Sequence, residues 1–207
     1  SDPVAEGIVI QKADERALAA GTTTDKIFDM VESIQDKMHV PMVFMTYANV
    51  IFVYGIEKFA KRSKEIGMSG VIIPDVPFEE KEEMDSVFSK YDLDVISLIA
   101  PTSHDRIQAI AAEAKGFVYC VSSLGVTGMR STINKGVAQM IEQVKKTKDI
   151  PCAIGFGIST PEQAKEMSEF SDGVIVGSAI VKLVETYGKE CIKPVSEYVK
   201  SMKEAIS

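Results

Sequence analysis

The sequence predicts an α/β fold built from six βα units with parallel strands. Short apolar segments alternate with amphipathic helical segments along the 207-residue chain, and no shift in composition marks a second domain. Two consecutive strands near the C-terminus both end in glycine, at 155–157 and at 177. A doubly wound open sheet fits six units, whereas a (β/α) barrel fits the paired glycine ends better but usually has eight units.

The first 39 residues are predicted to be a loop followed by two helices. Asp2 and Pro3 start the loop, and the segment then becomes helical. A threonine of 22–24 is expected to cap the second helix. At helical spacing, the apolar face of this second helix consists of Ile27, Val31, Ile34 and Met38.

Residues 40–188 are predicted to hold the six βα units. The apolar strand segments are 40–47, 70–76, 94–100, 116–122, 151–155 and 173–177. Each is followed by a helical pattern, with a stripe such as Val137, Met140, Ile141 and Val144 after the loop 123–134. Tyr187 and Gly188 close the last helix, and a polar helix from Pro194 to about Ala205 lies within the C-terminal segment 189–207. We therefore predict a single domain over residues 1–207.

Composition and charge limit the possible partners. With a net charge of −7 and a pI near 5.0, the chain is a poor candidate for binding nucleic acid or an anionic membrane. The basic pairs 61–62 and 145–146 are interpreted as solvated helix faces. Two histidines and three scattered cysteines offer no metal-ligand spacing, so no metal site is predicted. Cys120 and Cys152 are expected to be buried thiols in a reducing cytoplasm, and no signal peptide or membrane span is recognised.

The segment 150–181 predicts a phosphate site. It reads as strand, helix and strand, and each strand runs into a glycine that allows close backbone approach. Ser159 and Pro161 are expected to open the intervening helix, with Glu162 three residues after the serine. Ser178 is expected to cap the helix that follows, so that free N–H groups face the same place. Such tandem loops often bind phosphate in barrels, although strand-end glycines are common in α/β proteins.

Several other residues leave a structural and a functional interpretation open. Asp75, after a strand, is either a catalytic acid or a buried acid with a structural partner. Tyr119 is either a core aromatic residue or one whose hydroxyl points into the mouth of a barrel. Ile10, Met45 and Ile72 line an apolar pocket or belong to the core, and the loop 125–128 is a lid or an ordinary surface loop.

The joint pattern of several segments then resembles the α subunit of tryptophan synthase. The segments are SDPVAEG, MTYANVIFVYG, IIPDVPFEE, SLIAPTS, YCVSSLGVTG, IGFGISTPEQA and DGVIVGSAIVK, in this order along essentially the whole chain. The resemblance implies a TIM-type (β/α) barrel that cleaves indole glycerol phosphate to indole and glyceraldehyde phosphate. It implies no cofactor for this chain, and a β subunit as partner that uses pyridoxal phosphate to make tryptophan.

The resemblance also implies roles for individual residues. Phosphate would lie against Gly128, Phe156, Gly157, Gly177 and Ser178, with Thr127 in the loop that closes over the substrate. The indole would lie among Ile10, Met45, Ile72 and Tyr119, with Tyr119 counted among the catalytic candidates. Asp2 and Asn49 would lie near the β partner.

Two departures bear on catalysis. Retro-aldol cleavage suits two differently tuned carboxylates, one as a base and one assisting at the ring. One family carboxylate is an aspartate at the position of Glu6; the glutamate keeps the charge about one methylene further out and could still serve the ring nitrogen, so Glu6 is a catalytic candidate. The other family carboxylate is a glutamate on a strand upstream of the SDP segment. Residues 1–207 do not include that strand-borne glutamate, so we expect very low or no cleavage. We also expect the six strands either to close as a short barrel or to be completed in a homodimer, since exposed edges are a liability.

Two further functions stay open at this point. The chain could be a non-catalytic module that binds a phosphorylated ligand or a β subunit; Glu6→Ala would then leave ligand affinity unchanged. Alternatively it could be another phosphate-dependent barrel enzyme, because GSAIV-type strand ends occur widely among such barrels.

Overall fold

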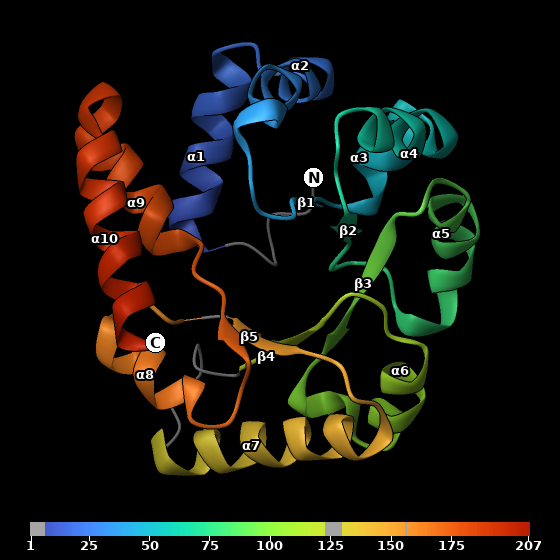
Figure 1. The fold of residues 1–207 in the computed structure, drawn as a ribbon. Coiled ribbons are helices and arrows are strands. Elements are labelled where there is room, and N and C mark those ends of the chain that lie inside the picture. Colours follow the sequence, from blue (N-terminus) through green and yellow to red (C-terminus); the bar gives the residue numbers. More distant parts are fainter. Residues whose placement is uncertain (1–6, 123–129, 156) are drawn as a thin grey trace. The chain divides into compact units, whose positions relative to one another are not determined.

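The computed structural model describes residues 7–122, 130–155 and 157–207, which are drawn in colour in Figure 1. The chain divides into two compact units. The first unit consists of residues 16–97 and the second of residues 7–15 together with 98–207. Helix α1 (Ile8–Ala19) and strand β3 (Asp94–Ile99) each contribute to both.

The first unit is a run of parallel strands and helices. Its further elements are α2 (Thr24–Ile34), β1 (Val43–Met45), α3 (Ala48–Tyr54), α4 (Ile56–Glu65), β2 (Gly70–Ile72) and α5 (Lys81–Phe88), with 3₁₀ turns at Gln35–Lys37, Phe78–Glu80 and Ser89–Tyr91. β1 pairs with β2 and β2 with β3, all parallel, with Met45 opposite Ile72 and Gly70 opposite Asp94. The predicted parallel βα pattern is confirmed for these strands, which are shorter than the apolar segments.

The second unit repeats the same pattern. It contains α6 (Ile107–Glu113), β4 (Val118–Val121), α7 (Arg130–Thr147), β5 (Cys152–Gly155), α8 (Pro161–Ser168), β6 (Gly173–Val174), α9 (Ser178–Tyr187) and α10 (Ile192–Ala205), with 3₁₀ turns at Pro101–Arg106 and Gly188–Glu190. β4 pairs with β5 and β5 with β6, again parallel. The apolar stripe predicted for α7 is buried as expected, but the helix begins at Arg130, inside the segment predicted as loop 123–134.

An aromatic cluster forms the core of the first unit. The centroid of the Phe28 ring lies 5.3 Å from that of Phe44, 5.4 Å from that of Tyr54 and 5.1 Å from that of Phe59. Offset and edge-to-face pairs at such spacings add to the free energy gained by burial. This cluster corrects the predicted face of α2, because Phe28 and Val31 are the buried residues and Ile27 is exposed.

Helix α3 was not predicted as a separate element. Gly55, with φ +94°, ends it and separates it from α4. Its sequence ANVIFVY is rich in β-branched and aromatic residues, which favour strands when no other contact intervenes. A contact from 27 residues further along the chain, described below, caps its first turn instead.

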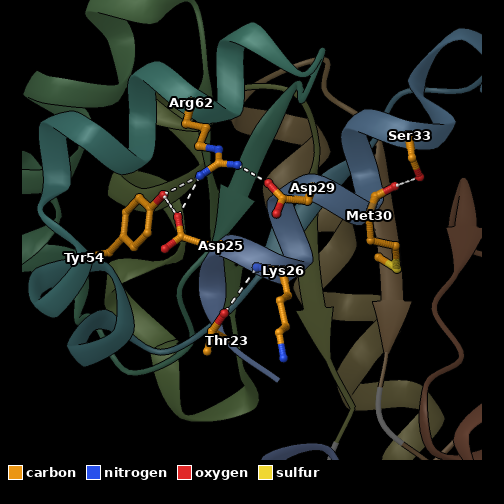
Figure 2. A network of polar contacts seen from close by, with 8 residues as sticks. All are labelled: Thr23, Asp25, Lys26, Asp29, Met30, Ser33, Tyr54 and Arg62. Atoms are coloured by element: carbon orange, nitrogen blue, oxygen red, sulfur yellow. Dashed lines mark hydrogen bonds and ion pairs between the residues drawn. The ribbon is translucent and has the colours of Figure 1, made fainter. Parts of the chain in front are cut away.

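A polar network ties α2 to α3 and α4 in the first unit (Figure 2). The Arg62 guanidinium donates to Asp25 at 2.7 Å, to Asp29 and to the Tyr54 hydroxyl at 3.1 Å, and Tyr54 donates to Asp25 at 2.6 Å. Arg62 also lies over the Phe28 ring, 5.1 Å from its centroid. The interpretation of Arg62 as part of a solvated face is therefore wrong.

The same correction applies to Lys145, which contacts Asp172 at 2.7 Å, while its neighbour Lys146 forms an exposed pair with Glu142. Cys120 and Cys152 are both fully buried as free thiols, as predicted. The neighbouring Cys152 thiol, together with burial, raises the pKa of Cys120. Within the described ranges, no helix combines the length and the apolar character needed to cross a bilayer.

The polar network predicts a pH-dependent contribution from Asp25. The hydrogen bond from Tyr54, aided by the charges of Lys58 and Arg62, holds the pKa of Asp25 below its ordinary value. A carboxylate with a depressed pKa stabilises the fold fully above its unfolded pKa, about 3.9, and loses this contribution as the pH falls through its folded pKa. Asp25→Asn should therefore lower the urea midpoint of unfolding at pH 7. The difference in midpoint between this variant and the unsubstituted chain should disappear at acid pH. Asp36→Asn, an exposed acid in the same unit, serves as the control; a gap that stays constant with pH would contradict the assignment.

Candidate functional site

The carboxyl ends of β5 and β6 place two loops side by side. Ala153 is opposite Gly173 and Ile154 is opposite Val174, and the Ile175 N–H continues the pairing by donating to Ile154 O at 2.7 Å. Both strands are parallel, so the residues that follow them leave the sheet at the same edge. This edge carries Gly157 on one loop and Gly177 with Ser178 on the other.

The two glycines have different roles. Gly157 has φ +78°, a conformation that favours glycine. Gly177 is the N-cap of α9, and a Cβ built on it would find no heavy atom within 4 Å. The backbone at Gly177 is therefore open to an approaching ligand.

The first turn of α9 follows directly. The carbonyl of Gly177 accepts from the N–H groups of Ile180 and Val181 at 2.9 and 3.1 Å, which leaves the earliest N–H groups without an intrahelical acceptor. The N-cap is Gly177, which has no side chain to cap the helix, and Ser178 is already the first helical residue, so the prediction that Ser178 caps α9 is wrong. An uncapped helix start is better suited to receive an anion than one closed by its own serine.

The cap of α8 also differs from the prediction. The N-cap is Thr160, whose hydroxyl accepts from the Gln163 N–H at 3.3 Å, while the Gln163 amide oxygen accepts from Thr160 N–H at 3.1 Å. Pro161 occupies the first helical position as expected. The capping box is therefore Thr160 with Gln163, one residue later than the predicted pair of Ser159 and Glu162.

Tyr119, on β4, lies over the end of β5. It is only 4% exposed, and a Cβ on Gly155 would come within 2.1 Å of its hydroxyl oxygen. Burial raises the pKa of Tyr119, so the hydroxyl stays protonated at neutral pH. The structure thus brings Tyr119 to the strand end that leads into Gly157.

Two residues that sequence reasoning missed support this corner. Ser122 is buried, and both its hydroxyl and its N–H donate to Gly155 O, at 2.9 and 3.0 Å. Asp172, just before β6, accepts from Cys152 N–H and from Lys145, each at 2.7 Å. A serine after a strand and an aspartate before one are weak signals, because neither reveals its partner.

Gly155→Ala is expected to destabilise the second unit, because the new methyl group overlaps the Tyr119 ring. Overpacking of this kind typically costs about 1–3 kcal/mol, since the buried ring has to move. Chemical unfolding followed by circular dichroism measures the loss. Gly173→Ala, on the neighbouring strand where a Cβ meets nothing within 4 Å, is the matched control; equal midpoints for the two variants would contradict the assigned contact.

The apolar candidates fall on both units. Ile10 lies on α1 and is half-buried, and the short segment before it is fixed by Ile10 N–H donating to Gly7 O at 3.0 Å. In the first unit, Met45 and Ile72 are direct partners in the β1–β2 ladder, so the structure brings these two together. Met45 is 50% exposed whereas Ile72 is 5% exposed.

The partner candidate Asn49 is exposed in the first turn of α3. Asp75, three residues after β2, accepts from the Ala48 N–H through both carboxylate oxygens, at 3.0 and 3.3 Å. Of the two interpretations of Asp75, this contact supports the structural partner, but the predicted burial is wrong because Asp75 is exposed. The remaining candidates lie outside the described residues: Asp2, Glu6, Thr127, Gly128 and Phe156.

Comparisons with known proteins agree on one family. The family model described as tryptophan synthase alpha chain matches residues 1–207. The tryptophan synthase alpha chain of Lacticaseibacillus casei is 45% identical over 206 residues, which is 100% of this chain and 77% of that protein.

Solved structures give the same answer for the fold. Tryptophan synthase subunit alpha from Campylobacter jejuni superimposes with a TM-score of 0.87 at 33% identity, over 96% of this chain and 80% of that one. A chain of the tryptophan synthase α2β2 complex from Pyrococcus furiosus gives 0.87 at 32% identity, over 99% and 83%. The predicted resemblance and the predicted TIM-type (β/α) barrel class are both confirmed.

Proposed function

Because the chain belongs to the tryptophan synthase alpha chain family, we propose that it takes indole glycerol phosphate as substrate and cleaves it to indole and glyceraldehyde phosphate. The observation that carries the proposal is the paired loop edge after β5 and β6. There the open backbone at Gly177 and the uncapped start of α9 offer N–H groups to a phosphate. Gly128, Phe156, Gly157 and Ser178 complete the proposed phosphate contacts.

The indole ring is proposed to lie among Ile10, Met45, Ile72 and Tyr119. The pairing of Met45 with Ile72 supports an apolar wall at the end of β1 and β2. Tyr119 supplies a hydroxyl that is protonated at neutral pH and therefore acts as a hydrogen-bond donor rather than as a base. Thr127 is proposed to belong to the loop that closes over the substrate.

The chemistry needs one base and one acid. A base removes the proton of the glycerol hydroxyl, the carbon–carbon bond to the ring breaks as the aldehyde forms, and the ring carbon takes up a proton. We propose that Glu6 assists at the ring nitrogen, where its carboxylate accepts a hydrogen bond. For residues 1–207 taken by themselves we propose very slow cleavage, because the family's second carboxylate has no counterpart among them.

We further propose that a tryptophan synthase β subunit docks near Asp2 and Asn49. Support comes from the exposed position of Asn49 and from the α2β2 assembly named for the Pyrococcus furiosus relative. The alternative assembly is a homodimer of this chain. We also propose that residues 1–207 belong to a single domain. The buried free thiols Cys120 and Cys152 support the proposed location in a reducing cytoplasm.

Indole release from indole glycerol phosphate, with excess β subunit, tests the proposal against a Glu6→Ala control. Turnover that vanishes in the control supports cleavage with Glu6 at the ring. Absence of both turnover and ligand binding in a folded sample would reject the proposed substrate. Binding without turnover would favour the non-catalytic module, and Glu6→Ala should then bind with unchanged affinity.

A further inference from the structure

Asp75 ties together the segments that leave β1 and β2. Its carboxylate accepts from the Ala48 N–H, which belongs to the first residue of α3. The N-cap residue of this helix, Tyr47, makes no side-chain cap of its own. A second hydrogen bond lies two residues earlier in the chain, where the Thr46 N–H donates to Ile72 O at 3.1 Å. The path of the chain from β1 into α3 is therefore held by the last residue of β2 and by the segment that follows it.

These ties lie between two sets of proposed functional residues. Met45 and Ile72, the proposed indole wall, are the last paired residues of β1 and β2. Asn49, the proposed contact to the β subunit, comes directly after Ala48 and is exposed. All of these residues belong to the first unit, so the connection runs within one compact body.

A carboxylate is well suited to such a connection. A hydrogen bond to a charged acceptor is stronger and shorter than a neutral one, and a negative charge near the first turn of a helix is stabilising. Loss of the acceptor leaves the Ala48 N–H to water and frees residues 47–49 from the segment that follows β2, while the Thr46 N–H stays bonded to Ile72 O. The indole wall and the exposed face at Asn49 would then move independently.

We propose that Asp75 is a positioning residue that couples docking of the β subunit at Asn49 to ligand binding at the ends of β1 and β2. This inference rests on the proposed function and deepens it, because it gives the partner contact a means of regulating the substrate site. Asp75 does not touch the substrate in this scheme and acts through Ala48.

The test is a double titration of the full chain. The affinity for indole glycerol phosphate is measured with and without saturating β subunit, and the ratio is the coupling factor, which must equal the effect of the ligand on β-subunit affinity. Asp75→Ala should bring this factor close to one and weaken β-subunit binding about tenfold or more. Asp75→Asn keeps an oxygen acceptor and should retain most of the coupling, and Glu80→Gln, a nearby exposed acid, should change nothing.

The outcomes separate the inference from the proposal beneath it. A wild-type chain that binds no β subunit overturns both, and Asn49→Ala that binds it normally overturns the proposed contact. If the wild-type chain binds the β subunit, two results overturn the inference alone. One is an Asp75→Ala chain with an unchanged coupling factor, and the other is an Asp75→Asn chain that loses the coupling as completely as Asp75→Ala. Should Asp75→Ala fail to fold, Asp75→Glu, which shifts the carboxylate by one methylene, makes the same comparison.

Discussion

Gly70→Ala is expected to lower the free energy of unfolding more than a glycine-to-alanine substitution in any other strand described above. A Cβ at this position would lie 2.3 Å from Asp94 O and 3.1 and 3.2 Å from Asp94 C and N. Gly70 and Asp94 are register partners of β2 and β3, and the obstructing atoms are backbone. Relief therefore requires the strands to separate, whereas an obstructing side chain could simply rotate away.

The expected loss is about 3 kcal/mol or more, at the upper end of what overpacking costs. This is a large part of the total stability of about 5–15 kcal/mol typical for a folded domain. Guanidinium unfolding monitored by circular dichroism gives the midpoint shift. Gly173→Ala, also at the first residue of a strand but with open space around the Cβ, should change stability by no more than about 0.5 kcal/mol. If both substitutions shift the midpoint equally, the close approach of β2 and β3 is not what requires glycine.

The sequence located all six strands but overestimated their lengths. The apolar segment 40–47 yields only Val43–Met45, and 173–177 yields only Gly173–Val174. An apolar pattern reports burial, and burial extends beyond the residues that pair with a neighbouring strand. The ends of strands depend on register, which follows from contacts between distant segments.

The same limit explains the errors in helices. The buried face of α2 is set by Phe28 because Phe44 and Phe59 lie against it, and neither is near it in sequence. The first N–H of helix α3 is bound by the Asp75 carboxylate, a contact that local propensity does not include. The buried face was predicted correctly where the apolar residues of the helix itself determine it, as for Val137 and Val144 of α7.

The candidate site divides along similar lines. Glycines at strand ends were sufficient to find the edge at Gly157 and Gly177, because their position after a strand is a local signal. The support for that edge is not local. Ser122 and Gly155 meet across neighbouring strands, and Gly155 has to be glycine only because Tyr119 lies over it.

Gly177→Asp is expected to abolish binding of the phosphorylated ligand while preserving the fold. Gly177 has φ −117° and ψ −76°, so no positive φ requires glycine at this position, and a Cβ there would meet no heavy atom within 4 Å. A capping residue usually has an extended backbone, whereas the backbone of Gly177 is in the αR region, so we expect the aspartate to leave the stability of α9 nearly unchanged. The same carboxylate would occupy the helix start that is proposed to receive the phosphate, and like charges brought together cost several kcal/mol. We therefore expect ligand affinity to fall by about 100-fold or more.

Gly177→Asn isolates the effect of charge from that of bulk, because asparagine is nearly isosteric with aspartate but carries no charge. Calorimetric titration with indole glycerol phosphate, and with glyceraldehyde phosphate as the smaller ligand, should show a much weaker effect for asparagine than for aspartate. The difference between the two variants should shrink as salt is added, since screening acts on the repulsion and not on the bulk of the side chain. If aspartate and asparagine weaken binding to the same extent at low salt, the start of α9 does not hold the phosphate, and the site has to be sought at another strand end.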